Sequence, residues 1–321
     1  ATTASRFDGY EYRVVVTGDC GSAVNSSPAM LTVLERPEIS TPPAAASTCE
    51  DGSVLFEVVP GNTTLPSYQW QVDMNGDNNY DDIQSDTAGI YSGFDQPALQ
   101  VTASSRFNGY RYRVIVGGSC TPEVTSPAVD LIVYEKPEIT DHPVNDTICE
   151  GESPTFMVNA GPTSSPAYQW QISTNSGADW YDLQDTAVFN GSGSHLLQLL
   201  NVPSSYSGAW FRAYVTGTCT PPDDATSNHA VLIVRERPEI IEQPEDTTVC
   251  ETNPVRFTVD AGVTFDAAYQ WQLDTGSGFT NFSDTAGVYT GTSTPELNVL
   301  NPESRFDGYH YRVLVSGECT P

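Results

Sequence analysis

The stretch GYRYRVIVGGSC, residues 109–120, recurs three more times in the chain. The other copies are GYEYRVVVTGDC (9–20), GAWFRAYVTGTC (208–219) and GYHYRVLVSGEC (308–319). Each copy alternates aromatic or β-branched residues with other residues, which is typical of a half-buried strand. Each also ends on a cysteine: Cys20, Cys120, Cys219 and Cys319. The spacing predicts a tandem repeat of 99 or 100 residues.

Other markers recur with the same period. Tryptophans stand within a repeated YQWQ motif: Trp70, Trp170 and Trp271. A second set of cysteines recurs with this period: Cys49, Cys149 and Cys250. Three similar segments mark the boundaries: LERPEI (34–39), YEKPEI (134–139) and RERPEI (235–240). Because proline follows the last predicted strand with no glycine or serine run, we expect stiff connections between repeats.

These boundaries divide the chain into four parts. Residues 1–36 are predicted to be the C-terminal part of a preceding repeat. Complete repeats are predicted at 37–135 and 136–236. The repeat at 237–321 is predicted to lack its last strand.

Each repeat contains short segments typical of β-strands. In residues 37–135 they are SVLFEVV (53–59), YQWQV (68–72), ALQVT (98–102), YRYRVIV (110–116) and VDLIVY (129–134). Gly, Pro, Asn and Asp separate these segments, and no stretch shows a sustained helical period. The predicted fold class is all-β, with a two-sheet sandwich in each repeat.

The repeat resembles the immunoglobulin-like domain. A tryptophan stands twelve residues after Val58, Val158 and Val259, at the place of the core tryptophan of that family. The GYxYRV phrase is similar to the sixth strand of the family, although apolar residues replace its two core cysteines. The resemblance implies a tandem array of immunoglobulin-like β-sandwich domains.

A narrower resemblance covers the whole chain. The combination of YQWQ, DTAGxYxG and SRFxGYxYRVxVxGxC is similar to the tandem immunoglobulin-like repeats of large secreted Bacteroidota surface proteins. These include gliding and adhesion proteins that the type IX system exports. The resemblance implies an extracellular, cell-surface location and an adhesin or filament.

The charge of the chain argues against two classes of partner. There are 41 acidic and 13 basic residues, and the net charge is −28. Such an acidic surface repels nucleic acids and anionic membranes. No apolar run approaches the roughly 18 residues of a membrane span. We therefore expect no nucleic-acid partner and no membrane insertion in this segment.

The sequence does not predict an enzyme. Its histidines fall at unrelated repeat positions, and no two of them share a metal-ligand spacing. It contains no nucleophile elbow, phosphate loop or zinc motif, so no catalytic residue is assigned. Trp180 and Trp210 have no tryptophan counterparts in the other repeats. They are candidates for a sugar-binding platform, with local packing or an inter-domain contact as the alternative.

One loop has the residue types of a calcium site. The stretch DMNGDNNYDD (73–82) places oxygen donors at alternate positions: Asp73, Asn75, Asp77 and Asp81. The alternative is an acidic hairpin turn, because Asn, Asp and Gly favour turns. Calcium is the one cofactor that the sequence suggests.

Asp-Thr followed by a small apolar residue recurs at one loop position. By resemblance to secreted Bacteroidota proteins, this pattern is an O-glycan acceptor. The candidate threonines are Thr87, Thr186 and Thr285, with Thr147 and Thr247 in a looser form of the pattern. The alternative is a turn in which the aspartate caps the backbone.

The seven cysteines predict disulfides in a chain that resembles secreted proteins. One pairing stays within each repeat: Cys49–Cys120, Cys149–Cys219 and Cys250–Cys319. In an immunoglobulin sandwich, however, the second and sixth strands run the same way, so the turns with these cysteines lie at opposite ends. That separates them by roughly 23 Å, and a disulfide spans no more than about 7 Å between Cα atoms. The resemblance therefore favours the inter-domain pairs Cys49–Cys219 and Cys149–Cys319, leaving Cys20, Cys120 and Cys250 for other repeats or other chains.

Two functions follow from these patterns. The first is a structural segment of an extracellular adhesin or filament, a rigid stalk that contacts neighbouring repeats of its own chain and other copies. The alternative is a carbohydrate- or protein-binding array with an unknown surface or glycan ligand, or the spacer of a secreted enzyme.

Overall fold

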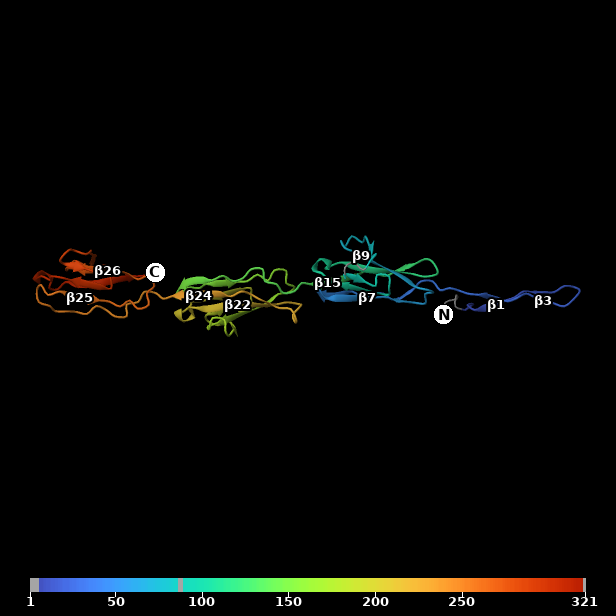
Figure 1. Cartoon of the computed structure of the whole chain (residues 1–321), viewed down its shortest axis with the longest axis horizontal. Helices are drawn as coiled ribbons and strands as arrows, with labels where there is room; N and C mark the ends of the chain where they lie inside the picture. The colour runs from blue at the N-terminus through green and yellow to red at the C-terminus, as the bar shows by residue number, and fades with distance from the viewer. Residues whose placement is uncertain (1–5, 86–88, 320–321) are drawn as a thin grey trace. The chain divides into compact units, whose positions relative to one another are not determined.

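A computed structural model describes residues 6–85 and 89–319 (Figure 1). The chain divides into two compact units. The first unit contains residues 1–137, 162–165 and 217–223. The second unit contains residues 138–161, 166–216 and 224–321. The described residues contain no helix with the length and hydropathy that a membrane span requires.

The first unit contains a complete β-sandwich, which we call the first sandwich. Its larger sheet has the order β10 (Asp81–Asp82), β9 (Ser67–Asp73), β13 (Arg111–Gly117), β15 (Val129–Tyr134) and β6 (Ala46–Cys49), with β14 (Val124–Thr125) beside β13. Its second sheet has the order β11 (Tyr91–Ser92), β12 (Ala98–Thr102) and β7 (Ser53–Glu57). β6 pairs with β15 in parallel, and the other pairs in these sheets are antiparallel. In Figure 1, β7 and β9 mark the two layers.

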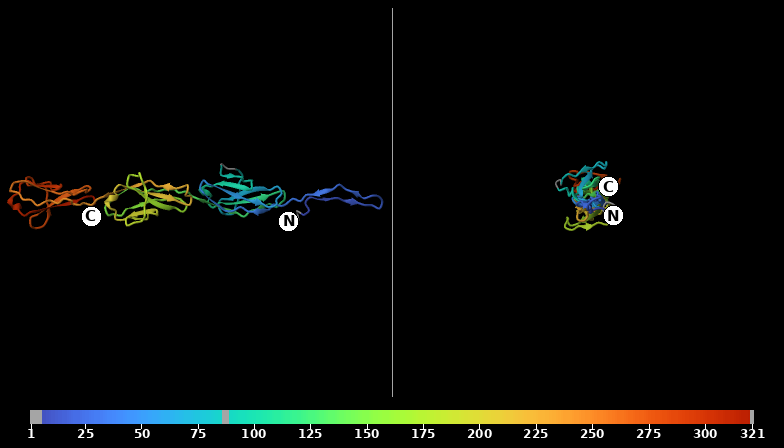
Figure 2. Two further views of the ribbon diagram at one scale, coloured as in Figure 1. Left: turned by 90° about the horizontal axis from the view of Figure 1, so that it is seen from below. Right: turned by 90° about the vertical axis from the view of Figure 1, so that its right-hand side faces the viewer.

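Residues 6–36, which we call the tail, form a long ribbon at the start of the first unit (blue in Figure 2). β1 (Tyr10–Tyr12) pairs with β4 (Ala29–Leu31), and β2 (Val15–Val16) pairs with β3 (Val24–Asn25). The tail is followed by β5 (Ile39–Thr41), which pairs with β8 (Val59–Pro60). The apolar side chains of the tail are exposed, because the described residues supply no second sheet to cover them.

The second unit contains the second sandwich. Its larger sheet has the order β16 (Asp146–Cys149), β24 (Ala230–Arg235), β22 (Ala209–Thr216), β18 (Ala167–Ser173) and β19 (Tyr181–Asp182), with β23 (Ala225–Thr226) beside β22. Its smaller sheet has the order β17 (Thr155–Met157), β21 (Leu196–Leu199) and β20 (Phe189–Asn190). The strand order and the parallel pairing of β16 with β24 repeat those of the first sandwich.

The third sandwich also lies in the second unit and has two three-stranded sheets. One has the order β25 (Val255–Thr258), β29 (Glu296–Val299) and β28 (Tyr289–Thr290), and the other β27 (Thr280–Asn281), β26 (Ala268–Asp274) and β30 (His310–Ser316). Among the described residues, the third sandwich has no strand in the place of β15 or β24. Each sandwich has one short 3₁₀-helix: η1 (Ser105–Phe107), η2 (Ser204–Tyr206) and η3 (Ser304–Phe306).

The repeated tryptophan is the centre of each core. Trp70, Trp170 and Trp271 are fully buried, and each indole Nε1 donates a hydrogen bond of 2.9 Å to a carbonyl oxygen. Each thereby satisfies its one polar atom. Val58 and Val114, at the places of the family's core cysteines, are buried as well. The all-β sandwich fold that the strand pattern predicts is confirmed.

Candidate functional site: the joints between repeats

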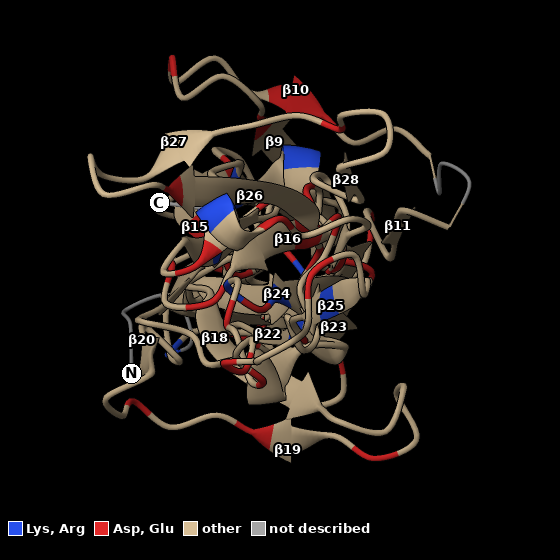
Figure 3. Cartoon of the chain, turned by 90° about the vertical axis from the view of Figure 1, so that its left-hand side faces the viewer, with Lys and Arg blue, Asp and Glu red and all other residues tan. Residues whose placement is uncertain are grey.

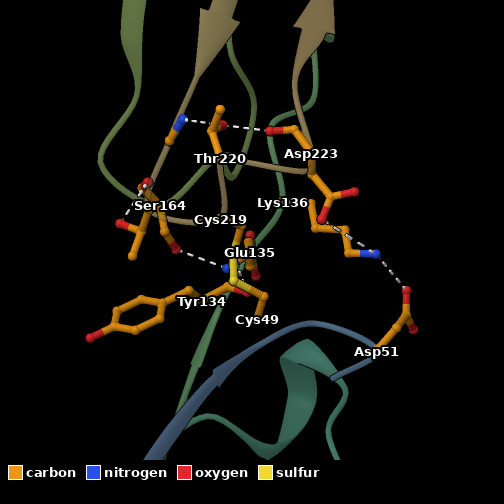
Figure 4. Close-up of a disulfide and its surroundings, with 11 residues drawn as sticks. Cys49, Asp51, Tyr134, Glu135, Lys136, Ser164, Cys219, Thr220 and Asp223 are labelled. Carbon is orange, nitrogen blue, oxygen red and sulfur yellow. Dashed lines mark hydrogen bonds and ion pairs between the residues drawn. A yellow bond between two sulfur atoms is a disulfide. The ribbon is translucent and has the colours of Figure 1, made fainter. Parts of the chain in front are cut away.

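Two disulfides lie where one predicted repeat ends and the next begins, and we call these places joints. The joint after the first sandwich contains the Cys49–Cys219 disulfide, with 5.8 Å between the Cα atoms (Figure 4). Cys49 is the last residue of β6 and pairs with Tyr134, the last residue of β15. The Sγ atom of Cys219 lies 3.6 Å from the carbonyl oxygen of Tyr134. The disulfide therefore joins two cysteines that both contact the end of one strand.

Polar contacts surround this disulfide (Figure 4). The backbone N–H of Glu135 donates to Ser164 Oγ at 2.9 Å, and the N–H of Thr218 donates to the Ser164 carbonyl at 2.9 Å. Lys136 Nζ lies 3.2 Å from an Asp51 carboxylate oxygen and 3.8 Å from one of Asp223. The hydrogen bond to Asp51 raises the pKa of Lys136. Exposed ion pairs of this kind contribute little to stability, so the disulfide is the stronger restraint.

A glycine lets the backbones approach closely in this joint. A Cβ atom on Gly217 would lie 2.8 Å from the Ser164 carbonyl oxygen and 2.9 Å from Thr163 Cγ2. Gly118 and Gly317 are equally crowded at the same repeat position, whereas a Cβ atom on Gly18, in the tail, would meet nothing within 4 Å. Glycine is therefore required at this position because the segment with Thr163 and Ser164 packs against it, and not because of the strand that precedes it.

The joint after the second sandwich lies in the second unit and has the same construction. Cys149 and Cys319 form a disulfide with 5.5 Å between the Cα atoms. Cys149 pairs with Arg235, the last residue of β24, and Cys319 Sγ lies 3.8 Å from the Arg235 carbonyl oxygen. The guanidinium of Arg235 lies over the ring of Phe265 at 3.9 Å and forms an ion pair with Glu318. Arginine thus adds a charged and stacked contact that Tyr134 does not make in the other joint.

The joint between the tail and the first sandwich has one of the two cysteines. Cys120 Sγ lies 3.6 Å from the carbonyl oxygen of Leu34, as Cys219 does from Tyr134. The N–H of Glu35 donates to Thr64 Oγ1 at 3.0 Å, which repeats the bond between Glu135 and Ser164. Cys120 is a free thiol, as are Cys20 and Cys250.

The cysteine pairs in the structure are the inter-domain pairs that the strand directions favour. The described structure contains none of the alternative pairs within a repeat, which are Cys49–Cys120, Cys149–Cys219 and Cys250–Cys319.

The calcium candidates lie in the turn after β9. The Asp73 carboxylate accepts backbone N–H bonds from Asn75, Gly76 and Asn78 at 2.8 to 3.1 Å. Burial pushes the pKa of Asp73 up, but these bonds together hold it below its usual value. Asp77 accepts an N–H bond from Asn79, and Asp81 lies on β10. These contacts are those of an acidic hairpin turn, which is the alternative to a calcium site.

The described residues bring together few charged metal ligands at this turn. No group of three or more His, Cys, Asp or Glu side chains suited to a metal occurs within residues 6–85 and 89–319. Figure 3 shows acidic residues in red on many segments, β10 among them, and few basic residues in blue. Calcium binding by Asp73, Asn75, Asp77 and Asp81 stays a prediction.

Four of the five O-glycan candidates lie on exposed positions. Thr147 lies on β16, Thr247 precedes Cys250, and Thr186 and Thr285 lie in equivalent loops. The aspartates before these last two cap the next turn: Asp185 accepts from the N–H of Ser192 at 2.8 Å, and Asp284 from that of Thr292 at 2.9 Å. Thr87 lies outside the described residues. Glycosylation at these threonines stays a prediction.

The two unmatched tryptophans pack against other side chains. Trp210 stacks on His229 with 3.8 Å between ring centroids, and Arg212 lies over Trp180 at 4.1 Å. One face of each indole is therefore already covered by another side chain. This agrees with local packing, the alternative to a sugar-binding platform.

The sequence does not reveal a network on the outer face of each sandwich. Arg113 Nε donates to Gln71 at 2.7 Å, Gln71 donates to Asp82 at 2.6 Å, and the guanidinium of Arg113 lies over Tyr80 at 3.8 Å. The same stack recurs in the other sandwiches, with Arg212 over Trp180 and Arg312 over Phe279. The signal in the sequence was the regular spacing of these arginines and of their glutamine partners in YQWQ, whereas the stacked aromatic residue differs between repeats.

No protein-family model matches the chain, and no curated protein matches its sequence. Solved structures with tandem immunoglobulin domains do match its fold. A three-domain I-band fragment of titin superposes with a TM-score of 0.59 over 89% of this chain and 95% of its own, at 15% sequence identity. A variant of the same titin domains gives a TM-score of 0.57 over 88% of this chain and 94% of its own, at 14% identity. The chain is therefore a tandem array of immunoglobulin-like β-sandwiches, and this likeness extends to the fold alone.

Proposed function

We propose that this chain is a structural segment of an extracellular surface protein, a stalk in which inter-repeat disulfides restrain successive sandwiches. The main support is the Cys49–Cys219 disulfide, which links cysteines 170 residues apart in two different repeats. The Cys149–Cys319 disulfide has the same separation of 170 residues. A disulfide that crosses a repeat boundary restrains the two domains against each other, whereas one within a sandwich stabilises only that sandwich.

The chemistry of the joints supports the extracellular location that we propose. Structural disulfides persist in oxidising compartments and are reduced in most cytosols, so a stalk held by them belongs outside the cell. The net charge of −28 favours solubility and disfavours binding to anionic partners. An adhesin or filament of the type IX secreted kind is the specific form that we propose. The packing of Trp180 and Trp210 lends no support to the alternative of a glycan-binding array.

Small-angle X-ray scattering on the oxidised chain tests the stalk. The Cys49→Ser/Cys219→Ser variant should sample a wider range of maximum dimensions than the wild type, because its first joint loses the covalent restraint. Cys20→Ser is the matched control, since this exposed cysteine is free in the structure. Identical scattering from the double variant and the wild type would show that the disulfide does not restrain the domains. A glycan array with the same oxidised protein tests the binding alternative, which specific micromolar binding would favour.

A further inference from the structure

The two disulfides overlap along the chain. We call Cys49–Cys219 the first disulfide and Cys149–Cys319 the second. Cys149 lies between the two cysteines of the first disulfide, and Cys219 lies between those of the second. Every peptide bond from Cys49 to Cys319 therefore lies inside a loop that at least one disulfide closes. A backbone break inside such a loop leaves the two parts of the chain joined by that disulfide.

The overlap divides this part of the chain into three segments. Residues 49–149 are enclosed by the first disulfide alone, and residues 219–319 by the second alone. Residues 149–219 are enclosed by both. Disulfides within single repeats would enclose no peptide that connects one repeat to the next, so this arrangement depends on the inter-domain pairs.

Each disulfide joint has two covalent connections between neighbouring repeats. In the joint after the first sandwich, the backbone passes through Glu135 and Lys136 beside the first disulfide (Figure 4). One cysteine of each disulfide is buried: Cys219 is 3% exposed and Cys319 is 5% exposed. A thiol reductant must reach a sulfur atom to break the bond, so this burial slows reduction. A break in the connecting peptide thus leaves the joint closed.

One exposed loop recurs in each of the three segments. It follows β9, β18 and β26, and it contains residues 74–79, 174–179 and 275–278 respectively. Almost all of these residues are exposed, and none of them belongs to the core of its sandwich. Exposed loops with small and polar residues are preferred sites of proteolytic cleavage. These loops are therefore where we expect an extracellular protease to break the backbone.

We propose that the overlapping disulfides keep the stalk covalently continuous after a single backbone break anywhere from Cys49 to Cys319. This inference rests on the proposed function, because continuity matters for a chain that connects two objects at its ends. The disulfides then have a second role besides restraint of neighbouring sandwiches, which is to carry tension past a cleaved peptide.

Tension takes a different route after each break. After a break in loop 74–79 it passes through the first disulfide, and after a break in loop 275–278 it passes through the second. After a break in loop 174–179, either disulfide carries it, because the segments on both sides are intact. The middle segment therefore tolerates a break together with the loss of one disulfide, whereas the other two segments do not.

A sandwich with a broken loop also keeps its strand pairs. A break in loop 74–79 divides the first sandwich into a part with β7 and β9 and a part with β12 and β13. Seven register pairs join β9 to β13, and five join β12 to β7. The first disulfide keeps the two parts at an effective concentration on the order of millimolar, so these ladders form within one molecule.

Cleavage at one engineered site tests the proposal in the full chain. A recognition sequence for a site-specific protease is inserted into loop 74–79, 174–179 or 275–278 of the oxidised protein. After cleavage, the free thiols are alkylated and the products are separated on a denaturing gel without reductant. We expect each cleaved protein to run as one covalent species, and to separate into two fragments when reductant is added. Separation of any of the three proteins without reductant would overturn the proposal.

The variant without the first disulfide, Cys49→Ser/Cys219→Ser, gives a pattern specific to overlap. It should separate after cleavage in loop 74–79 and stay joined after cleavage in loop 275–278. It should also stay joined after cleavage in loop 174–179, which the second disulfide still encloses. Disulfides within each repeat would instead let loop 174–179 separate in this variant, and that result would overturn the proposal.

The matched variant without the second disulfide is Cys149→Ser/Cys319→Ser. It should separate after cleavage in loop 275–278 and stay joined after cleavage in loops 74–79 and 174–179. If both variants separate at the same loop, the disulfides do not overlap in the way that we propose.

Thermal unfolding of the protein cleaved in loop 74–79 measures whether the first sandwich survives the break. Its midpoint should not depend on protein concentration while the first disulfide is present. In Cys49→Ser/Cys219→Ser the midpoint should fall on dilution, because the two parts then associate as separate molecules. A midpoint that falls on dilution in the wild type as well would contradict the proposal.

The cleavage pattern and the scattering experiment fail independently. If the pattern is as expected but the scattering of wild type and Cys49→Ser/Cys219→Ser is identical, the chain is covalently continuous and the proposed restraint of the stalk is wrong. If the scattering differs and the cleavage pattern does not follow the overlap, the restraint stands and the tolerance of backbone breaks is wrong.

Discussion

The first sandwich and the third have the same central residues, but the described part of the third has no strands in the places of β6, β14 and β15. Phe56, Trp70 and Tyr112 are fully buried in the first, where β15 covers one edge of the core. In the third, Trp271 is still fully buried, but Phe257 and Tyr311 are only half-buried. The tryptophan is therefore buried by the strands that both sandwiches share, whereas the full burial of the two neighbouring rings depends on the strands that only the first sandwich shows.

The joints show a similar difference. The early cysteines Cys49 and Cys149 are half-buried in complete joints, whereas Cys250, at the same repeat position, is exposed. The last strand of a repeat thus has two roles: it completes the core of its own sandwich and it places the early cysteine for the next one. Four substitutions follow: two test this comparison, and two test differences between the first and second sandwiches.

The largest effect is expected from Leu131→Asp. It places a carboxylate at a fully buried position of β15, which should cost about 4 kcal/mol or more and detach the strand from the first sandwich. Hydrogen exchange should then accelerate at the backbone amides of β6 and β13. Ile132→Asp, on the exposed side of the same strand, is the control and should change stability by less than about 0.5 kcal/mol. Unchanged protection of β6 and β13 in Leu131→Asp would contradict the role given to the strand.

Gly217→Ala should disturb a complete joint. The new methyl group would clash with the Ser164 carbonyl and with Thr163, at a cost of about 1 to 3 kcal/mol. The measurement is hydrogen exchange of the Thr218 amide, which donates to Ser164 in the wild type. Gly18→Ala, at the same repeat position in the open tail, should have almost no effect. If both variants behave alike, close packing in the joint does not explain the glycine.

The pair Tyr91 and Tyr112 should be sensitive to loss of one hydroxyl. Their oxygens lie 3.4 Å apart, and burial raises the pKa of both, so each hydroxyl keeps its proton and the pair can share a hydrogen bond. Tyr112→Phe should cost about 1 kcal/mol, because it leaves the Tyr91 hydroxyl without this partner. The double variant Tyr91→Phe/Tyr112→Phe should recover part of the loss in thermal unfolding.

The second sandwich supports this expectation. It has Phe189 and Phe211 at the two positions, with ring centroids 6.3 Å apart, the same distance as between Tyr91 and Tyr112. A double variant whose loss of stability equals the sum of the two single losses would argue against coupling of the hydroxyls.

The smallest effect is expected from Asp73→Ser, which gives the first sandwich the residue of the second. Ser173 accepts N–H bonds from Asn175 and Gly177, as Asp73 does from its own turn. The pKa of Asp73 lies below its usual 3.8, so the carboxylate stabilises the fold above pH 3.8 and loses this effect as the pH falls through its lowered pKa. Thermal unfolding of wild type and variant should therefore differ at neutral pH and converge in acid. Asp19→Ser, in the exposed tail, should show no such convergence.

Much of the fold could be predicted because each strand of the repeat has a recognisable local sequence pattern. The segments 98–102 and 129–134 are strands with the bounds predicted from alternation and turn residues. The segment 53–59 is divided between β7 and β8, because Val59 leaves the ladder with β12 and pairs with β5. Alternation shows which side of a strand is apolar, but it does not show which partner the strand will take.

The candidate sites were predicted less completely. Residue types suggested calcium at Asp73, yet its oxygens accept backbone N–H bonds within the turn. The contacts of Arg235 with Phe265 and Glu318 were not predicted, because they join segments of two repeats and have no local pattern. The same holds for the crowding around Gly217.

The sequence by itself determined the repeat, the strands and the buried tryptophans, since each depends on spacing and hydropathy along one stretch of chain. It also restricted the cysteine pairs, once the strand directions of the resembling family were assumed. Only the tertiary structure decided that Cys49 and Cys219 meet at the end of β15, and that the backbone at Gly217 lies against Ser164. Both depend on distances between segments far apart in the sequence, which the packing of the sheets determines and no local pattern encodes.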